Sequence, residues 1–507
     1  MRRLTVGHTP LRTERAAGAA SGYAIAGSLF MVLCLATVVA FAQTKPVADK
    51  IPITTSSEEA RSLYLQGRDL AEKLRATDAR QLYERAVAND PSFALGHLGL
   101  ANTSGTTKEF IDATTKAASL ADKVSEGERH MILAVEANLK GDPASALNHY
   151  SDLVRLFPND ERAHTLLANL YFGRQDYESA VKHFTKATTI NPNFSQPYNQ
   201  LGYAYRFLEK FTEAETTFKK YTELIPNDPN PYDSYAELLM KMGRFQDSIA
   251  KYEKALSIDP NFVASYVGIG NDHMFIGHLD QARATFAKLA SVARNTGERR
   301  QARFWTAASY LHEGATEKAI AELKASYALA EGDNDRASMA GDLTLMGDVL
   351  REAGQLDQAS AKYAEAVKVM STARVPEEVK EANRRNDVFE EGRLAVARND
   401  LPTAKAKAAE YAKLVAVRKA PFEIRQQHEL AGLMALAEKR GADAAQEFAQ
   451  ANQQDPRILY LTALAYQQAG DASKASTFAN KAANFNGLSF NYGYVKSKAR
   501  KISGTSF

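Results

Sequence analysis

The sequence contains a single cysteine among its 507 residues. That residue, Cys34, lies in a stretch near the N-terminus, residues 16–44, that lacks charged side chains altogether. The remainder of the chain has no thiol, which excludes disulfide bonds and thiol catalysis from it. Its stability must therefore come from the packing of its secondary structure.

The chain also lacks a large net charge. It has 63 Lys and Arg residues against 60 Asp and Glu residues, and without residues 1–42 it has 59 of each. Binding to nucleic acid requires an excess of basic side chains that neutralise phosphates, so we expect no nucleic-acid partner. Local basic clusters are expected on solvated loops and helix faces, at Arg294, Arg299, Arg300 and Arg303 and at Lys496, Lys498, Arg500 and Lys501.

Catalytic and metal-binding motifs are missing as well. The sequence has no phosphate-binding or dinucleotide-binding glycine motif and no G-x-S-x-G turn. His428 and Glu429 begin a zinc-protease pattern, but Gly432 occupies the place of its second histidine. His273 and His278 would diverge by about 140° around a helix. We therefore expect no enzymatic activity, no metal and no cofactor.

The uncharged N-terminal stretch predicts export. Residues 23–42 are almost wholly apolar, and about 20 such residues suffice to cross a bilayer. The preceding arginines place the N-terminus in the cytoplasm. Ala40-Phe41-Ala42 is also typical of a signal-peptide cleavage site. A cleaved signal peptide and a retained transmembrane anchor both fit, and both predict a chain that is periplasmic or anchored in the inner membrane, with membrane contact only through residues 23–42 if uncleaved.

What the sequence does contain is a pattern repeated every 34 residues. A column of small residues keeps this spacing from position 146 to position 282, and aromatic and proline columns follow it. A fixed period of this size indicates stacked supersecondary units. The columns are Ala146, Ala180, Ala214, Ser248 and Ala282; Tyr150, Phe184, Phe218, Tyr252 and Phe286; and Pro158, Pro192, Pro226 and Pro260.

Each period divides into two predicted helices. In one window an apolar stripe from His164 to Tyr171 has helical spacing, and a turn at residues 173–176 ends it. A second stripe follows and stops at Pro192. The small-residue column marks the position where the two helices cross closely. Ser248 belongs to this column, so its likeness to a Ser-x-x-Lys catalytic pair is interpreted as structural.

The repeat resembles the tetratricopeptide repeat. Residues 195–228 match that pattern at Tyr198, Leu201, Gly202, Tyr205, Ala214, Phe218 and Pro226, with Tyr198 in place of the opening tryptophan. Weaker copies bring the total to about twelve between residues 60 and 489, although the period is lost after Val292. The resemblance implies an all-α, right-handed solenoid of antiparallel helix pairs, preceded by the signal or anchor helix.

These observations predict six parts of the chain. Residues 1–22 are a basic cytoplasmic region, 23–42 the signal or transmembrane segment and 43–59 a linker. Residues 60–296 form a first repeat array and 297–489 a second, more degenerate one. Residues 490–507 are expected to form a C-terminal cap and tail.

The resemblance also implies where a partner binds. In this family the first helices line a concave surface that meets the partner. Amide side chains at such positions can hydrogen-bond an extended peptide, and aromatic and methionine side chains offer apolar contact. Tyr203 and Arg206 are the strongest candidates. The predicted peptide-binding positions are Thr165, Asn169, Phe172, Asn199, Tyr203, Arg206, Asp233, Glu237, Met240, Asn271, Met274 and Phe275.

The function that follows is a non-enzymatic protein-interaction scaffold of the cell envelope, holding an extended peptide or a partner helix. The alternative is a structural component of an envelope complex, which would assemble through its convex face and terminal repeats.

Overall fold

The computed structural model describes residues 49–504, except 74, 105–106, 376 and 419. The chain divides into two units, residues 1–46 and 47–507, and the predicted signal or anchor at residues 23–42 lies outside the described residues. Within the described part, none of the helices combines the length and the apolar character needed to cross a bilayer.

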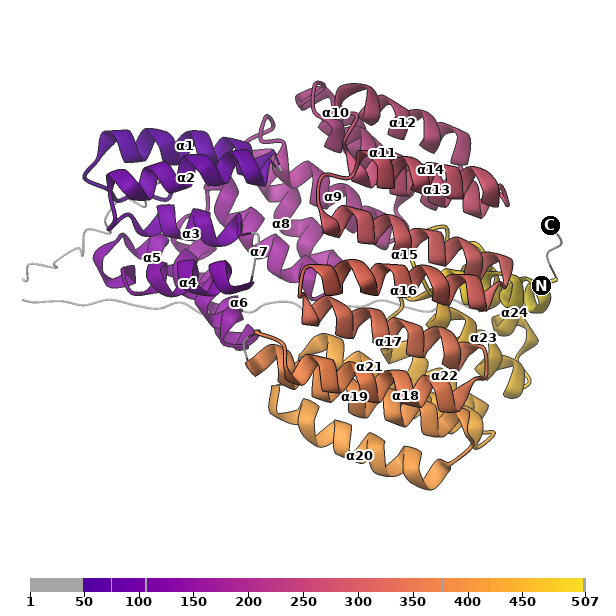
Figure 1. Ribbon diagram of the computed structural model, residues 1–507. Coiled ribbons are helices and arrows are strands. Elements are labelled where there is room, and N and C mark those ends of the chain that lie inside the picture. The colour runs from indigo at the N-terminus through magenta and orange to yellow at the C-terminus, as the bar shows by residue number, and fades with distance from the viewer. Residues whose placement is uncertain (1–48, 74, 105–106, 376, 419, 505–507) are drawn as a thin grey trace, which may run out of the picture. The chain divides into compact units, whose positions relative to one another are not determined.

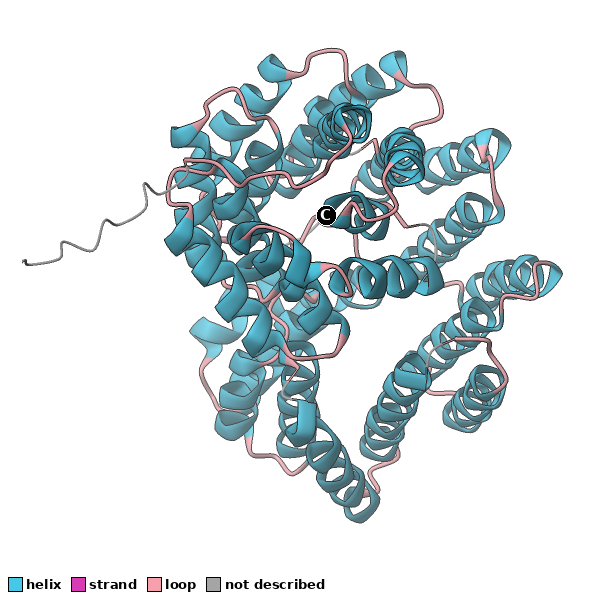
Figure 2. Ribbon diagram, turned by 90° about the vertical axis from the view of Figure 1, so that its left-hand side faces the viewer, coloured by secondary structure: helices cyan, strands magenta, loops and turns pink. Residues whose placement is uncertain are grey.

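All regular secondary structure in the described residues is helical (Figures 1 and 2). Helices α1 to α24 follow one another as twelve antiparallel pairs, and α25 follows the last pair. This confirms the prediction of an all-α stack of about twelve repeats. The α-helices are α1 Glu58–Glu72, α2 Ala76–Asn89, α3 Ala94–Asn102, α4 Thr107–Ala118, α5 Glu126–Leu139, α6 Pro143–Leu156, α7 Glu161–Gly173, α8 Tyr177–Ile190, α9 Gln196–Phe207, α10 Phe211–Leu224, α11 Pro229–Lys241, α12 Phe245–Ile258, α13 Val263–Phe275, α14 Leu279–Val292, α15 Thr296–Glu313, α16 Thr316–Gly332, α17 Arg336–Glu352, α18 Leu356–Ser371, α19 Glu377–Ala397, α20 Leu401–Arg418, α21 Pro421–Ala437, α22 Gly441–Gln450, α23 Pro456–Gln468, α24 Ala472–Ala483 and α25 Tyr492–Ser503, with a short 3-10 helix at Ala121–Lys123.

The repeated columns form the core of each pair. All five members of the small-residue column are fully buried, as a close helix crossing requires. Three rings of the aromatic column, Phe218, Tyr252 and Phe286, pack against glycines of the first helices. A Cβ atom at Gly202 would lie 2.6 Å from Phe218 Cζ, and one at Gly270 would lie 2.1 Å from Phe286 Cε1. Glycine therefore makes room for a ring that a larger first-helix residue would displace.

The proline column has a second role that the sequence did not reveal. The side chain six residues after each proline forms a hydrogen bond with the carbonyl oxygen of that proline. Tyr198 donates to Pro192 at 3.1 Å, and Tyr266 donates to Pro260 at 2.9 Å. His164 Nε2 makes the same contact with Pro158 at 3.1 Å. These hydrogen bonds tie the first helix to the preceding turn.

The loss of the 34-residue period has a simple structural cause. Helices α5 to α14 contain 12 to 14 residues each. Helices α15 to α21 contain 16 to 21 residues. The insertions thus lengthen helices without interrupting the pairing, and α14 packs directly on α15.

Candidate functional site

The first helices of successive pairs form one continuous surface, here called the inner surface. Helix α7 contacts α9, α9 contacts α11, α11 contacts α13 and α13 contacts α15. The second helices contact mainly their own partner and the next first helix. The predicted peptide-binding positions all belong to α7, α9, α11 and α13, so the structure places them on this one row of helices.

The structure divides the twelve predicted residues into two groups. Asn169 is exposed, and Phe172, Tyr203, Arg206 and Glu237 are half-buried. The other seven side chains are buried against the protein's own helices. They are Thr165, Asn199, Asp233, Met240, Asn271, Met274 and Phe275.

Two of the buried polar members are held by local hydrogen bonds. Thr165 Oγ1 donates to the carbonyl of Glu161 at 2.7 Å, and Asn271 Nδ2 donates to the carbonyl of Val267 at 2.9 Å. Both contacts lie one turn back along the same helix. These two side chains therefore stabilise their own helices.

Tyr203 and Arg206 contact each other, and both have further partners within the fold. The guanidinium lies 4.7 Å from the Tyr203 ring centroid and 4.9 Å from that of Phe207. Arg206 Nη1 also donates to Glu237 Oε2 at 3.1 Å. Burial, together with the nearby Glu237 carboxylate, raises the pKa of Tyr203 well above its usual value. Tyr203, Arg206, Phe207 and Glu237 thus form an aromatic and charged cluster between α9 and α11, here called the Arg206 cluster.

An amide-lined cavity lies beside the Arg206 cluster. It has a volume of about 50 Å³ and receives side chains from α1, α7, α9 and α10. Asn199 Nδ2 is fixed there by Asn230 Oδ1 at 2.8 Å and Ser234 Oγ at 3.0 Å. We call this the amide cavity; it is lined by Glu72, Asn169, Gln196, Asn199, Gln200 and Tyr221.

Sequence reasoning found only two of those six residues. Gln196 and Gln200 share α9 with Asn199, so their spacing of three and one residues from it was an available signal. Glu72 carried no such signal, because it lies on α1. It reaches this region through an ion pair with Arg162 on α7, at 2.6 Å.

Two buried carboxyl groups occupy first-helix positions further along. Burial raises the pKa of Asp233 to about 8 and that of Asp272 to about 8. Asp233 accepts a hydrogen bond from Ser265 Oγ at 2.7 Å. Asp272 is fully buried, and neither of its oxygens has a hydrogen-bond partner in the described part of the chain. Ser248, the residue of the Ser-x-x-Lys likeness, donates instead to the carbonyl of Ala236 at 2.9 Å.

The C-terminal segment, residues 484–503, covers the inner surface at α13 and α15. Met240, Met274 and Phe275 belong to the same apolar cluster as Phe490 and Tyr492. Helix α25 packs against α15 and α23 as well as against α24. The predicted cap is therefore in contact with helices far from the end of the array.

The first helices of the later pairs carry a ladder of buried and half-buried charges. Arg393 Nη1 lies 2.9 Å from Glu390 Oε1, and its Nε lies 3.4 Å from Glu429 Oε1. Arg457 pairs with the same Glu429. Burial raises the pKa of Glu390 to about 7, whereas the neighbouring arginines lower the pKa of Glu429. We call this set the charge ladder; its side chains are Asp348, Arg351, Glu390, Arg393, Glu429 and Arg457, on α17, α19, α21 and α23.

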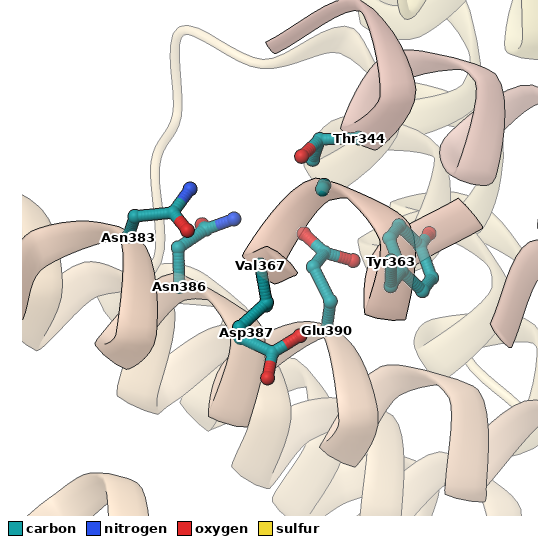
Figure 3. A pocket seen from close by; sticks show the side chains of 8 residues that line it. Thr344, Tyr363, Val367, Asn383, Asn386, Asp387 and Glu390 are labelled. Atoms are coloured by element: carbon teal, nitrogen blue, oxygen red, sulfur yellow. The ribbon is translucent and has the colours of Figure 1, made fainter. Parts of the chain in front are cut away.

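A small cavity lies beside the charge ladder (Figure 3). It encloses about 10 Å³ between α17, α18 and α19 and is lined by Thr344, Tyr363, Asn383, Asp387 and Glu390, among others. This volume accommodates about one water molecule. Burial raises the pKa of Asp387 to about 6, but the space is too small for an organic substrate.

Histidines pair with one another in two successive repeats. His130 Nδ1 lies 3.1 Å from His149 Nδ1, and His164 Nδ1 lies 3.1 Å from His183 Nδ1. Burial lowers the pKa of His183 to about 4. In the described residues no three His, Cys, Asp or Glu side chains are arranged to hold a metal ion. The rings of His273 and His278 lie 6.1 Å apart.

Comparisons with solved structures gave helical repeat proteins. The MamA protein is 22% identical, with 33% of this chain and 91% of that chain covered and a TM-score of 0.30. YrrB, described as a TPR protein with an unusual peptide-binding site, is 18% identical, with 36% and 91% covered and a TM-score of 0.26. A tetratricopeptide repeat protein from Parabacteroides merdae is 16% identical, with 56% and 98% covered and a TM-score of 0.35.

Comparison with curated protein sequences gave no match. Family models described as tetratricopeptide repeat match residues 161–194, 195–228 and 229–262, and further models of that description match residues 64–104 and 267–334. The three adjoining matches are each one 34-residue period, in register with the buried columns. The chain is therefore a tetratricopeptide repeat protein.

Proposed function

We propose that this protein is a non-enzymatic scaffold that binds an extended segment of a partner protein on its inner surface, at the amide cavity. The observation that carries the proposal is the convergence of four amide side chains, Asn169, Gln196, Asn199 and Gln200, on one cavity. An amide group offers both donors and an acceptor, as a peptide backbone requires. The TPR fold typically serves such interactions.

The neighbouring Tyr203 and Arg206 supply the apolar and charged side of the proposed site. Arg206 is held by Glu237 and by two aromatic rings, so its position is set before a partner arrives. Preorganised side chains lose less conformational entropy on binding. A peptide that crosses from α7 to α11 would contact the amides first and the Arg206 cluster second.

We further propose that the scaffold works in the cell envelope. This rests on the sequence of residues 1–42, in which arginines precede an apolar stretch and a small-residue site. Mass analysis of the N-terminus of the native protein, recovered from separated cell fractions, tests it. A chain that begins at Gln43 in the periplasm, or an intact chain in the inner membrane, would support export, whereas a cytoplasmic chain would contradict it.

A binding experiment tests the proposed peptide site. Residues 45–507 are used to select binders from a displayed library of unstructured peptides. Selected peptides should bind at least tenfold more weakly to the double variant Asn169→Ala with Gln200→Ala. The matched control removes two exposed amides elsewhere, Asn193→Ala with Gln281→Ala, and should bind as the wild type does.

Equal binding by all three proteins would contradict the proposed site. The amide variants are preferable to Tyr203→Ala with Arg206→Ala, because loss of Arg206 would leave Glu237 without its ion-pair partner. A weaker fold would then be hard to distinguish from a weaker site.

A second proposed function is assembly into a larger envelope complex, and one observation favours it. Three of the exposed large apolar side chains in the described residues lie around the turn between α20 and α21. Leu414 is 38% exposed, Val417 86% and Phe422 56%. If assembly uses this turn, Val417→Asp with Phe422→Asp should release the complex, while the amide variants should not.

A further inference from the structure

The C-terminal segment packs against α11, α13 and α15, which are distant from it in sequence. Their contact surface is here called the seat, and it includes Lys241, Phe275, Phe304 and His312. The ring of Tyr492 packs 5.0 Å from that of Phe275 on α13 and 5.7 Å from that of His312 on α15, measured between centroids. Phe490 packs 4.8 Å from Phe304, also on α15. Tyr492 is fully buried. Two aromatic side chains thus anchor the segment to α13 and α15.

Two lysines add reciprocal polar contacts between the segment and the seat. Lys496 Nζ donates to the carbonyl of Phe275 at 2.7 Å. Phe275 is the last residue of α13, so its carbonyl has no partner within the helix and lies at the negative end of the helix dipole. In the opposite direction, Lys241 Nζ of α11 donates to the carbonyl of Phe485 at 2.6 Å.

Because these ammonium groups are buried, the segment is held less tightly in the seat than an apolar segment would be in an apolar core. In the described residues both ammonium groups contact carbonyl oxygens and aromatic rings, without a carboxylate partner. Burial lowers the pKa of Lys496 to about 7 and that of Lys241 to about 8. The buried hydroxyl of Tyr494 has no hydrogen-bond partner there either. Buried charges and unsatisfied polar atoms oppose tight binding.

From this arrangement we infer that the seat on α11, α13 and α15 is a recognition site for a helix bearing aromatic residues and a lysine. In this structure the protein's own C-terminal segment occupies it. In trans it would take a helix of a partner protein with the chemistry of Phe490, Tyr492 and Lys496. This seat is separate from the amide cavity, so its failure would leave the proposed peptide site untouched.

The kind of partner follows from the features that the seat presents. Phe275, Phe304 and His312 offer rings to an incoming aromatic side chain. The terminal carbonyl of α13 requires a donor, and a cation interacts most favourably at that end of a helix. A lysine on a helical segment satisfies both requirements, whereas an acidic segment would satisfy neither.

The test uses residues 45–507 with the segment weakened in place by Tyr492→Ala and Lys496→Ala. The probe is a fluorescent peptide with the sequence of residues 484–503, and binding is followed by anisotropy. The weakened protein should bind the peptide at least tenfold more tightly than the wild type, whose seat is occupied. The same peptide carrying both alanines should not bind.

A third substitution checks the location. Adding Phe275→Ala to the weakened protein should abolish peptide binding, because the ring that faces Tyr492 is then gone. If the weakened protein is folded by circular dichroism and still fails to bind the peptide, the segment is a permanent part of the core and the inference is wrong.

Hydrogen exchange of the wild-type protein tests the inference without any substitution. The segment should open on its own, so amides in α25 should exchange at least tenfold faster than those in the middle of α13 and α15. Exchange of α25 at the same rate as α13 and α15 would show that the segment opens only with the whole fold. That result would overturn the inference even if the weakened variant does not fold.

Discussion

Helices α5 to α14 and helices α15 to α23 use the same pairing but differ on their inner surfaces. In the first region the inner positions carry amides, aromatic side chains and the Arg206–Glu237 ion pair, several of them exposed or half-buried. In the second region the corresponding surface carries the charge ladder, in which Glu390, Arg393, Glu429 and Arg457 are buried. The small-residue, aromatic and proline columns thus hold the helix pairs together, while the residue types at the inner positions differ between the two regions.

The comparison is tested most strongly at the centre of the charge ladder. Arg393→Ala should destabilise the fold by about 3–5 kcal/mol, because it leaves the buried Glu390 and Glu429 without this partner. Urea unfolding measures the loss. Arg384→Ala removes an exposed arginine from the same helix and should cost at most about 1 kcal/mol. Similar losses for the two variants would mean that the ladder contributes no more than a surface ion pair.

The two buried carboxyl groups on α11 and α13 predict that the stability of the fold depends on pH. The pKa of Asp272 is about 8 in the folded state and about 3.9 in an unfolded chain. The folded state therefore keeps a proton that the unfolded state releases, and the free energy of unfolding falls as the pH rises from 4 towards 8. One such group contributes at most about 1.4 kcal/mol per pH unit. Asp233 acts in the same direction.

Asp272→Asn should remove the contribution of that one group. Thermal unfolding between pH 5 and pH 9 should show a flatter profile for the variant than for the wild type. Asp280→Asn, at an exposed position on α14, should keep the wild-type profile. Identical profiles for all three proteins would show that Asp272 does not retain its proton.

The contact between first-helix glycines and the aromatic column predicts a smaller effect among helices α5 to α14. Gly202→Ala should destabilise the fold by about 1–3 kcal/mol, since its Cβ would lie 2.6 Å from Phe218 Cζ. Gly173→Ala is the matched control, because no atom lies within 4 Å of that Cβ position. Chemical denaturation distinguishes them. A neutral Gly202→Ala would mean that the ring moves aside at little cost.

The smallest expected effect concerns the hydrogen bonds to the proline column. Tyr266→Phe removes the bond to the Pro260 carbonyl and should cost about 0.5–1.5 kcal/mol. Tyr198→Phe removes the equivalent bond at a more exposed site and should cost less. If the order of the two losses were reversed in urea unfolding, burial would not be what strengthens this contact.

The helix pairs were predictable because their determinants are local. The small, aromatic and proline columns lie within one repeat, and each acts on a neighbouring helix. The pairing therefore survived even where longer helices removed the 34-residue period after Val292. The position of Asn169 on an exposed inner surface was predictable for the same reason.

The surroundings of other predicted site residues were not local. Phe275 packs against Tyr492, which follows it by more than 200 residues, and nothing in the repeat near Phe275 signals that contact. Glu72 enters the amide cavity because α1 comes close to α7 and α9. The charge ladder also lay hidden, since its members look like ordinary charged positions on separate helices.

The sequence by itself determined a stack of paired helices, because periodic small and aromatic residues specify contacts between neighbours. It also determined that the described chain has no thiol chemistry to draw on. Only the tertiary structure decided which inner positions stay accessible and which are covered. That outcome depends on the return of the C-terminal segment and on contacts between distant helices, which no single repeat encodes.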